Sequence, residues 1–269
     1  MPIGPARMPL FDHLGELRRR LTIVVVSVII GAVVMYFATP TVLDILKDPI
    51  APYLPDGKMY VLTALGGFST RFSIAIKLGV IMATPMIIWQ FLAFFLPALK
   101  PSERKWVVPT VGAATALFFF GAVFCYFLIV PTAFEWMIGQ SNSIGTALAG
   151  LEDYINTEIL LLIGFGVAFE LPLAVFYLAV FRIVPYSAFR GAWRYIYVAL
   201  LVASASLTPD ASPVTLMFMY SVMILLYEAA LAVTRFVVLA RDGRAGLSES
   251  RLGIFGDDED EEGEGEDRK

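Results

Sequence analysis

Six long apolar runs dominate this chain, and they limit what it can fold into. A run of about 20 apolar residues is long enough to cross the hydrocarbon layer of a bilayer as a helix. Because that layer offers no water to backbone N–H and C=O groups, each run must satisfy them within its own helix. With 58% hydrophobic and 16% charged residues, the chain is also more apolar than a soluble domain. We therefore predict an all-α integral membrane protein with six transmembrane helices.

The last two runs are unusual in length. We place the first four helices at 21–39, 69–95, 106–130 and 153–181, with a loop over 40–68. Only 15 uncharged residues separate Arg194 from Asp210, and 17 separate Asp210 from Glu228. We therefore expect the last two helices to be short. Because proline bends a helix, Pro85 and Pro172 are expected to shape a concave bundle.

The charges predict how the chain is oriented and divided. With both termini inside, 16 of the 20 lysines and arginines fall in internal segments, as the positive-inside rule favours. We divide the chain into a cytoplasmic N-terminal segment (1–20), a six-helix transmembrane domain (21–240) and a cytoplasmic acidic tail (241–269). Residues 252–269 hold nine acids and two bases, a composition that predicts disorder. The rest of the chain holds 18 bases and 15 acids, so the net negative charge belongs to the tail.

Several classes of chemistry lack the residues they need. His13 is the only histidine and Cys125 the only cysteine, which argues against histidine-based triads, multi-histidine metal sites and an intramolecular disulfide. No GxxxxGK[ST] sequence is present, so the chain carries no Walker-type nucleotide site. We therefore expect no enzyme activity, cofactor, metal site or nucleic-acid partner.

Glu170 lies near the middle of the fourth run. Glu158 precedes it by twelve residues and Arg182 follows it by twelve, which places each about 18 Å away along a helix. An acid near the midplane of a bilayer is costly and marks a functional site by default. The alternative is a buried acid that is hydrogen-bonded to neighbouring helices.

Two further acids lie on the predicted cytoplasmic face. Glu16 precedes a run of three arginines, and Glu103 follows Ser102 at the start of the third helix. One interpretation is structural, with Glu16 paired to Arg19 or Arg20 and Glu103 favoured by the helix dipole. The other is a site for a cationic ligand.

Four motifs in order along the chain resemble one protein family. They are His13-Leu14-x-Glu16-Leu17-Arg18-x-Arg20-Leu21, Phe94-x-x-Pro97-x-Leu99-x-x-x-Glu103-Arg104, Phe169-Glu170-x-Pro172 and Leu207-Thr208-Pro209-Asp210. This pattern resembles the TatC family, the polytopic subunit of the twin-arginine protein translocase, over residues 10–240. Ala98 stands where the family commonly has glycine, and the last motif has one proline where many members have two.

The resemblance implies a receptor for folded precursors whose signal peptide carries two adjacent arginines. Carboxylates accept guanidinium groups through two hydrogen bonds, so we expect Glu16 and Glu103 to bind the arginine pair. Phe94 would contribute an apolar or cation–π contact, and Arg18 would orient the acids. Glu170 would be a polar point in a lipid-facing concavity.

The resemblance also implies partners and a location. Single-span subunits of the TatA and TatB types would dock at the last two helices, where Ser204, Ser206, Thr208 and Thr215 favour close helix approach. The alternative for these hydroxyl residues is packing within the chain itself. The family further implies a multi-copy receptor complex in the inner membrane, with transport driven by the proton gradient.

A secondary transporter that uses Glu170 as an ion- or proton-coupling site is the alternative function. Such a protein should show internal repeats and paired broken helices, and no repeat is visible in this sequence. Binding of single-span subunits and a twin-arginine precursor would distinguish the two functions.

Overall fold

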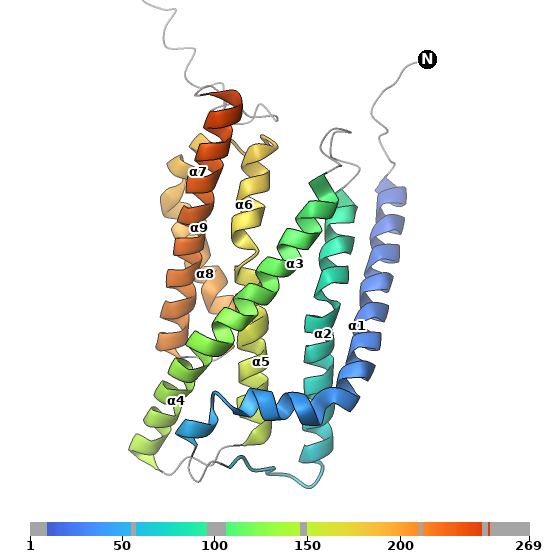
Figure 1. The fold of residues 1–269 in the computed structure, drawn as a ribbon, viewed down its shortest axis with the longest axis vertical. Coiled ribbons are helices and arrows are strands. Elements are labelled where there is room, and N and C mark those ends of the chain that lie inside the picture. The colour runs from blue at the N-terminus through green and yellow to red at the C-terminus, as the bar shows by residue number, and fades with distance from the viewer. Residues whose placement is uncertain are drawn as a thin grey trace, which may run out of the picture. The chain divides into compact units, whose positions relative to one another are not determined.

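The computed structural model describes residues 10–54, 58–95, 106–145, 150–209, 212–243 and 247, and these ranges are almost wholly helical (Figure 1). The helices are α1 (Leu10–Lys47), α2 (Gly66–Phe95), α3 (Val107–Phe124), α4 (Val130–Ile144), α5 (Leu151–Ala168), α6 (Leu171–Val180), α7 (Tyr186–Gly191), α8 (Trp193–Leu207) and α9 (Pro213–Asp242). A 3₁₀ turn covers Ala51–Tyr53, and a π-helical segment, Cys125–Ile129, joins α3 to α4. The acidic run 252–269 and Glu103 lie outside the described residues.

All six predicted apolar runs form helices. Five stretches are long and apolar enough to cross a membrane: Gly15–Lys47, Gly66–Phe94, Val107–Ile144, Leu151–Val180 and Pro213–Ala240. The remaining apolar helix, α8, has 15 residues. The chain divides into two compact units, Met1–Ile163 and Gly164–Lys269, and each is described by itself below.

In the first unit, α1 packs antiparallel against α2 with their backbones in close approach. A Cβ atom on Gly31 would lie 2.8 Å from the carbonyl oxygen of Gly79, and one on Gly79 would lie 2.5 Å from the backbone nitrogen of Ala32. Neither position has room for a side chain, so the two glycines let the helices touch. Side-chain hydrogen bonds join the same two helices on either side of this crossing: Arg20 binds Gln90 on one side, and Arg71 binds the Tyr36 carbonyl on the other. These contacts fix how the two helices align along their length.

Pro40 does not end the first helix, contrary to the loop predicted over 40–68. Figure 1 shows instead that α1 turns sharply before its end and continues to Lys47. Proline has no N–H to donate to the carbonyl four residues before it, here that of Tyr36. Arg71 on α2 takes its place: its Nε and Nη2 donate to the Tyr36 oxygen at 3.1 and 2.9 Å. The guanidinium also lies over the Tyr36 ring, 4.5 Å from its centroid.

The segment after the bend is held at its far end by Tyr126. This hydroxyl donates to the carbonyl oxygen of Ile45 at 2.7 Å, so it binds a carbonyl in the last turn of α1. Tyr126 belongs to the π-helical segment, which lies just before Pro131. The wider π turn moves the carbonyls away from the proline ring, so the helix continues through Pro131 to Ile144. The third helix is therefore longer than the predicted 106–130.

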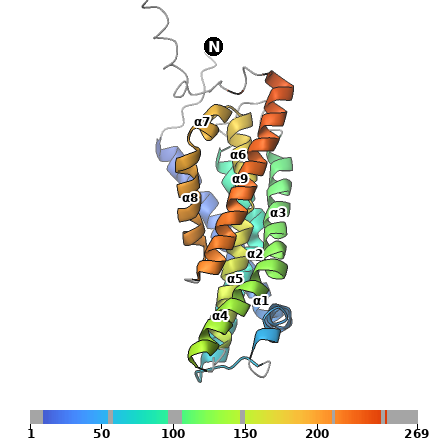
Figure 2. The same cartoon turned by 90° about the vertical axis from the view of Figure 1, so that its left-hand side faces the viewer.

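In the second unit, the fourth apolar run is interrupted. A turn at Phe169–Glu170 separates α5 from α6, two residues before Pro172, as expected from the missing N–H of that proline. Here α9 packs against both α6 and α8 (Figure 2). The end of α8 also lies close to α5, since a Cβ on Gly164 would come within 2.8 Å of the Leu207 carbonyl oxygen.

Of the two helices expected to be short, only α8 is. The last helix, α9, has 30 residues and continues well beyond Glu228, whereas the spacing of charges predicted a short helix. That carboxylate is bound by Arg190 and Tyr197, so it does not interrupt the helix. A paired charge near the end of an apolar helix is therefore a poor marker of the point where the helix stops.

Candidate functional site

One charged cluster lies at the end of the α1–α2 pair and contains Glu16. Glu16 and Arg20 are four residues apart on α1, so their side chains share a face. Arg20 Nε donates to Glu16 Oε1 at 3.0 Å, and Nη2 contacts the same oxygen. Both side chains are about one-quarter exposed, at 23% for Glu16 and 22% for Arg20. The structural interpretation of Glu16 as the partner of Arg20 is therefore correct for the chain on its own.

Arg20 also reaches the second helix. Its Nη1 donates to Oε1 of Gln90 at 3.3 Å, and the Gln90 amide nitrogen lies 3.6 Å from the sulfur of Met86. Gln90 is buried at 8% exposure, so its oxygen is a fixed acceptor inside the helix pair. Arg20 thus uses different nitrogens for a carboxylate on α1 and an amide on α2.

Two of the four predicted binding residues, Glu16 and Phe94, lie at the same end of the α1–α2 pair. Phe94 is half-buried and lies one turn beyond Gln90 on the same face of α2, which places it at the end of the helix pair that carries Glu16. Arg18 is exposed and lies two residues from Glu16, a spacing that puts the side chains on different faces. Arg20 is therefore the arginine that holds Glu16. The fourth residue, Glu103, falls in 96–105, outside the described ranges.

Glu170 lies at the break between α5 and α6. It is half-buried, and its Oε1 is buried with no hydrogen-bond partner among the described residues. Its backbone groups are both hydrogen-bonded, because its N–H donates to the carbonyl of Val167 and its carbonyl accepts from the N–H of Ala174. Glu170 is thus a carboxyl group at a helix break with an unused oxygen.

A second intramembrane acid, Glu158, was not singled out from the sequence. Its side chain is fully buried, and neither carboxyl oxygen has a partner within the described ranges. From the sequence, Glu158 stands out only as the charged neighbour twelve residues before Glu170. Its burial depends on which face of α5 is covered, and the spacing of charges does not reveal this.

Lys77, also in an apolar run, joins α2 to α5 within the first unit. Its Nζ donates to Ser73 Oγ at 2.7 Å and to Asn156 Oδ1 at 2.8 Å. Nearby, Thr70 donates to Glu152 at 3.3 Å. The signal in the sequence is the spacing 70, 73 and 77, which places three polar residues on one face of α2.

Three of the four hydroxyl residues predicted for partner docking are buried inside the second unit. Ser204 and Thr215 are fully buried, and Thr208 is 9% exposed. Ser204 donates to the carbonyl of Leu200, and Thr208 donates to that of Ser204. Of these four residues, Ser206 is the one that is exposed.

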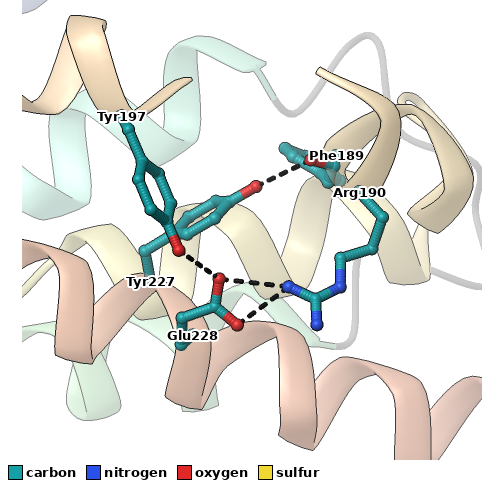
Figure 3. Close-up of polar contacts among 5 residues, drawn as sticks. All are labelled: Phe189, Arg190, Tyr197, Tyr227 and Glu228. Atoms are coloured by element: carbon teal, nitrogen blue, oxygen red, sulfur yellow. Dashed lines mark hydrogen bonds and ion pairs between the residues drawn. The ribbon is translucent and has the colours of Figure 1, made fainter. Parts of the chain in front are cut away.

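Glu228 belongs to a cluster that joins α7, α8 and α9 (Figure 3). Arg190 Nη1 donates to both Glu228 oxygens, at 3.1 and 2.9 Å, and the Tyr197 hydroxyl donates to Oε1 at 2.8 Å. Next to it, Tyr227 donates to the carbonyl of Phe189 at 3.0 Å. The Glu228 carboxylate raises the pKa of the Arg190 guanidinium, so Arg190 stays positively charged.

No group of three or more His, Cys, Asp or Glu side chains within the described ranges is placed to hold a metal ion. The polar side chains instead bind one another and backbone carbonyls between helices. Together with the long apolar helices, this defines a multi-pass helical membrane protein with a charged cluster at one end of a helix pair.

Comparison with known proteins gives the family. The family model described as "Sec-independent protein translocase protein (TatC)" matches residues 12–221. The chain is 33% identical over 240 residues to the TatC protein of Deinococcus radiodurans, covering 87% of this chain and 89% of the relative. It is 30% identical to the TatC protein of Carboxydothermus hydrogenoformans, covering 86% and 94%. The chain belongs to the TatC family.

Solved structures agree with this assignment. The fold matches a crystal structure described as the twin-arginine translocase receptor TatC with a TM-score of 0.73 and 29% identity, covering 83% of this chain and 98% of that one. A second crystal structure of that receptor, in the detergent DDM, matches with a TM-score of 0.72. The resemblance and the six-helix fold predicted from the sequence are thus confirmed. The family consists of translocase subunits, which supports a protein-transport role and neither an enzyme nor the alternative secondary transporter.

Proposed function

We propose that this chain is the receptor and scaffold subunit of a twin-arginine translocase. It binds the signal peptides of folded precursors at its cytoplasmic face and recruits single-span subunits of the TatA and TatB types. Family membership and the match to solved structures of such a receptor support this role. The charge distribution of the sequence supports an inner-membrane protein with both termini in the cytoplasm.

Glu16 and Glu103 form the acidic site for the arginine pair. The observation that carries this proposal is the cluster at the end of the α1–α2 pair, where Glu16 already binds a guanidinium group in this chain. A carboxylate that accepts Arg20 has the charge and reach to accept an arginine of a signal peptide. Phe94, on the same end of the pair, offers a ring for the second contact. Arg18 was predicted to orient the two acids, but because it faces away from Glu16, Arg20 takes this role for Glu16 and Arg18 adds positive charge to the exposed surface of α1.

The remaining predicted sites have roles in assembly and insertion. Glu170, with its unused carboxyl oxygen at a helix break, is a polar point for an inserting signal or partner helix. The α8–α9 hairpin is the docking surface for single-span subunits. Ser206 is the hydroxyl residue that faces outward there, while Ser204, Thr208 and Thr215 set the shape of the hairpin from inside. Several copies of the chain assemble in one receptor complex.

Crosslinking of a twin-arginine signal peptide tests the site. We expect Glu16→Gln, Glu103→Ala and Glu103→Gln each to lower crosslinking about tenfold or more, because hydrogen bonds to charged groups are worth about 1.5–3 kcal/mol. Glu135→Gln is the matched control, since Glu135 lies on α4, far along the chain from both acids. Undiminished crosslinking in all three site variants would contradict the proposed site.

A further inference from the structure

Glu16, the carboxylate proposed above to bind the signal peptide, is already bound by Arg20. We propose that Arg20 is a resident competitor: its guanidinium holds Glu16 while the site is empty, and a signal-peptide arginine must displace it. This inference rests on the proposed function and adds a regulatory residue to its site.

Arg20 has a second hydrogen-bond acceptor that it can keep after it is displaced from Glu16. Nε and Nη2 face Glu16, while Nη1 faces Gln90. When an incoming guanidinium takes Glu16, Arg20 can therefore keep its bond to α2. Gln90 suits this role because it is buried, its oxygen is a neutral acceptor, and its amide group is held beside Met86. The displaced charge then remains at a partly exposed position, so it is not stranded in the apolar interior.

The exchange replaces one guanidinium–carboxylate pair by another of the same kind. Its cost is the strength of the internal pair, and partly exposed pairs one helical turn apart are weak. The resident arginine therefore lowers the affinity of every cationic ligand by one modest factor. Competition of this kind leaves the ratio between an arginine and a lysine ligand unchanged. A twin-lysine signal peptide lacks the planar two-pronged contact, so its affinity for Glu16 is already lower than that of a twin-arginine peptide. Competition by Arg20 lowers that affinity by the same factor again.

This predicts a gain of binding on removal of Arg20, whereas a purely structural residue would give a loss. The experiment measures the affinity of a fluorescently labelled twin-arginine signal peptide, and of its twin-lysine version, for the full-length protein in nanodiscs. In Arg20→Gln we expect tighter binding of both peptides by the same factor, about two- to fivefold. Arg19→Gln is the matched control, because it removes a neighbouring exposed charge and leaves the Glu16–Arg20 pair intact.

A second variant should change the peptide affinity in the opposite direction. Gln90→Leu leaves a displaced Arg20 without its acceptor on α2, so displacement from Glu16 costs more and both peptides should bind about two- to threefold more weakly. If Arg20→Gln does not yield folded protein, Arg20→Lys should again tighten binding, since its ammonium group cannot make the two-pronged contact.

The outcomes separate the two proposals. Weaker or unchanged binding in Arg20→Gln, with binding still lost in Glu16→Gln, overturns the resident competitor and leaves the proposed site standing. Unchanged binding in Glu16→Gln overturns the use of that carboxylate, whatever Arg20 does. A gain in Arg19→Gln equal to that in Arg20→Gln would mean that only net charge matters, and this also overturns the inference.

Discussion

At the scale of single residues, prolines and polar side chains act together inside the apolar helices. Pro40 leaves the carbonyl of Tyr36 without its usual donor, and Arg71 supplies two. A charged side chain in an apolar run is therefore no sign of a transport pathway here, because its hydrogen-bonding capacity serves a neighbouring backbone. The helix bend and the arginine are two parts of one local structure.

This pairing predicts coupled mutations. Arg71→Gln should lower the free energy of unfolding by about 1.5–3 kcal/mol, the value of hydrogen bonds to a charged group. In a Pro40→Ala background, residue 40 regains an N–H and the Tyr36 carbonyl regains its helical donor, so the same change should cost less. A double-mutant cycle of unfolding in detergent measures the coupling. Strictly additive effects would show that Arg71 does not act through this carbonyl.

At Glu158, by contrast, we expect a substitution to stabilise the protein. This carboxyl group is fully buried and has no hydrogen-bond partner in the part of the chain that the structure describes, which costs free energy. A residue of similar length without polar oxygens removes that cost. Glu158→Met should therefore raise the free energy of unfolding by about 1–3 kcal/mol. Denaturant titration in detergent gives the value, with Glu152→Met as the control, because Glu152 accepts a hydrogen bond from Thr70. A loss of stability in Glu158→Met would mean that the carboxyl group is satisfied.

Residues that act within one helical turn were the most predictable. The Glu16–Arg20 pair follows from a spacing of four, and the interruption near Pro172 follows from the missing N–H of proline. The partner of Arg71 did not follow, because Tyr36 lies 35 residues earlier and its carbonyl is free only because of Pro40. The burial of Glu158 was missed for a similar reason, since it depends on the packing of separate helices.

At the scale of elements, the close approach of α1 and α2 depends on two glycines. A Cβ at Gly79 would meet the backbone of α1 at 2.5 Å, and backbone atoms cannot move aside as a flexible side chain can. Gly79→Ala should therefore separate the helices and lower the free energy of unfolding by about 1–3 kcal/mol. Gly112→Ala on α3 is the control, because within the described ranges no atom beyond its own stretch of helix lies within 4 Å of its Cβ position, and it should be neutral or slightly stabilising.

Thermal unfolding of both variants in the same detergent compares them directly. Equal melting temperatures for Gly79→Ala and Gly112→Ala would contradict the tight crossing. The prediction also extends to Arg71 and Gln90, which bridge the same helices on either side of Gly79, so helix separation should weaken both contacts.

Element positions were predictable from hydrophobic length, but element ends were less so. We predicted that helices end at Pro40 and Pro131 and that the helix containing Glu228 is short, but all three residues lie inside longer helices. Each is compensated by tertiary structure: an arginine binds the freed carbonyl, a π-helical segment relieves the proline ring, and Arg190 pairs with the acid. Local rules of helix termination do not include such compensation. The short helix α8 has the predicted length of 15 residues, and α2 ends at Phe95 as predicted.

At the scale of the whole molecule, the predicted site residues fall into different compact units. Glu16 and Phe94 belong to Met1–Ile163, whereas Glu170 and Ser206 belong to Gly164–Lys269. Residues without shared partners usually act additively. Binding of the signal peptide and docking of single-span subunits should therefore respond to separate mutations.

Ser206→Leu and Glu16→Gln test this separation. Among the four hydroxyl residues predicted for docking, Ser206 is the exposed one, so a larger side chain there should lower crosslinking of a TatA- or TatB-type subunit severalfold without unfolding the chain. Ser204→Leu is the contrasting variant, since Ser204 is fully buried and its replacement should destabilise the second unit. The double variant Glu16→Gln/Ser206→Leu should bind signal peptide as weakly as Glu16→Gln alone and capture the partner as poorly as Ser206→Leu alone. Loss of peptide affinity in Ser206→Leu would show that the two functions are coupled across the units, because Ser206 has no place in the peptide site of the first unit.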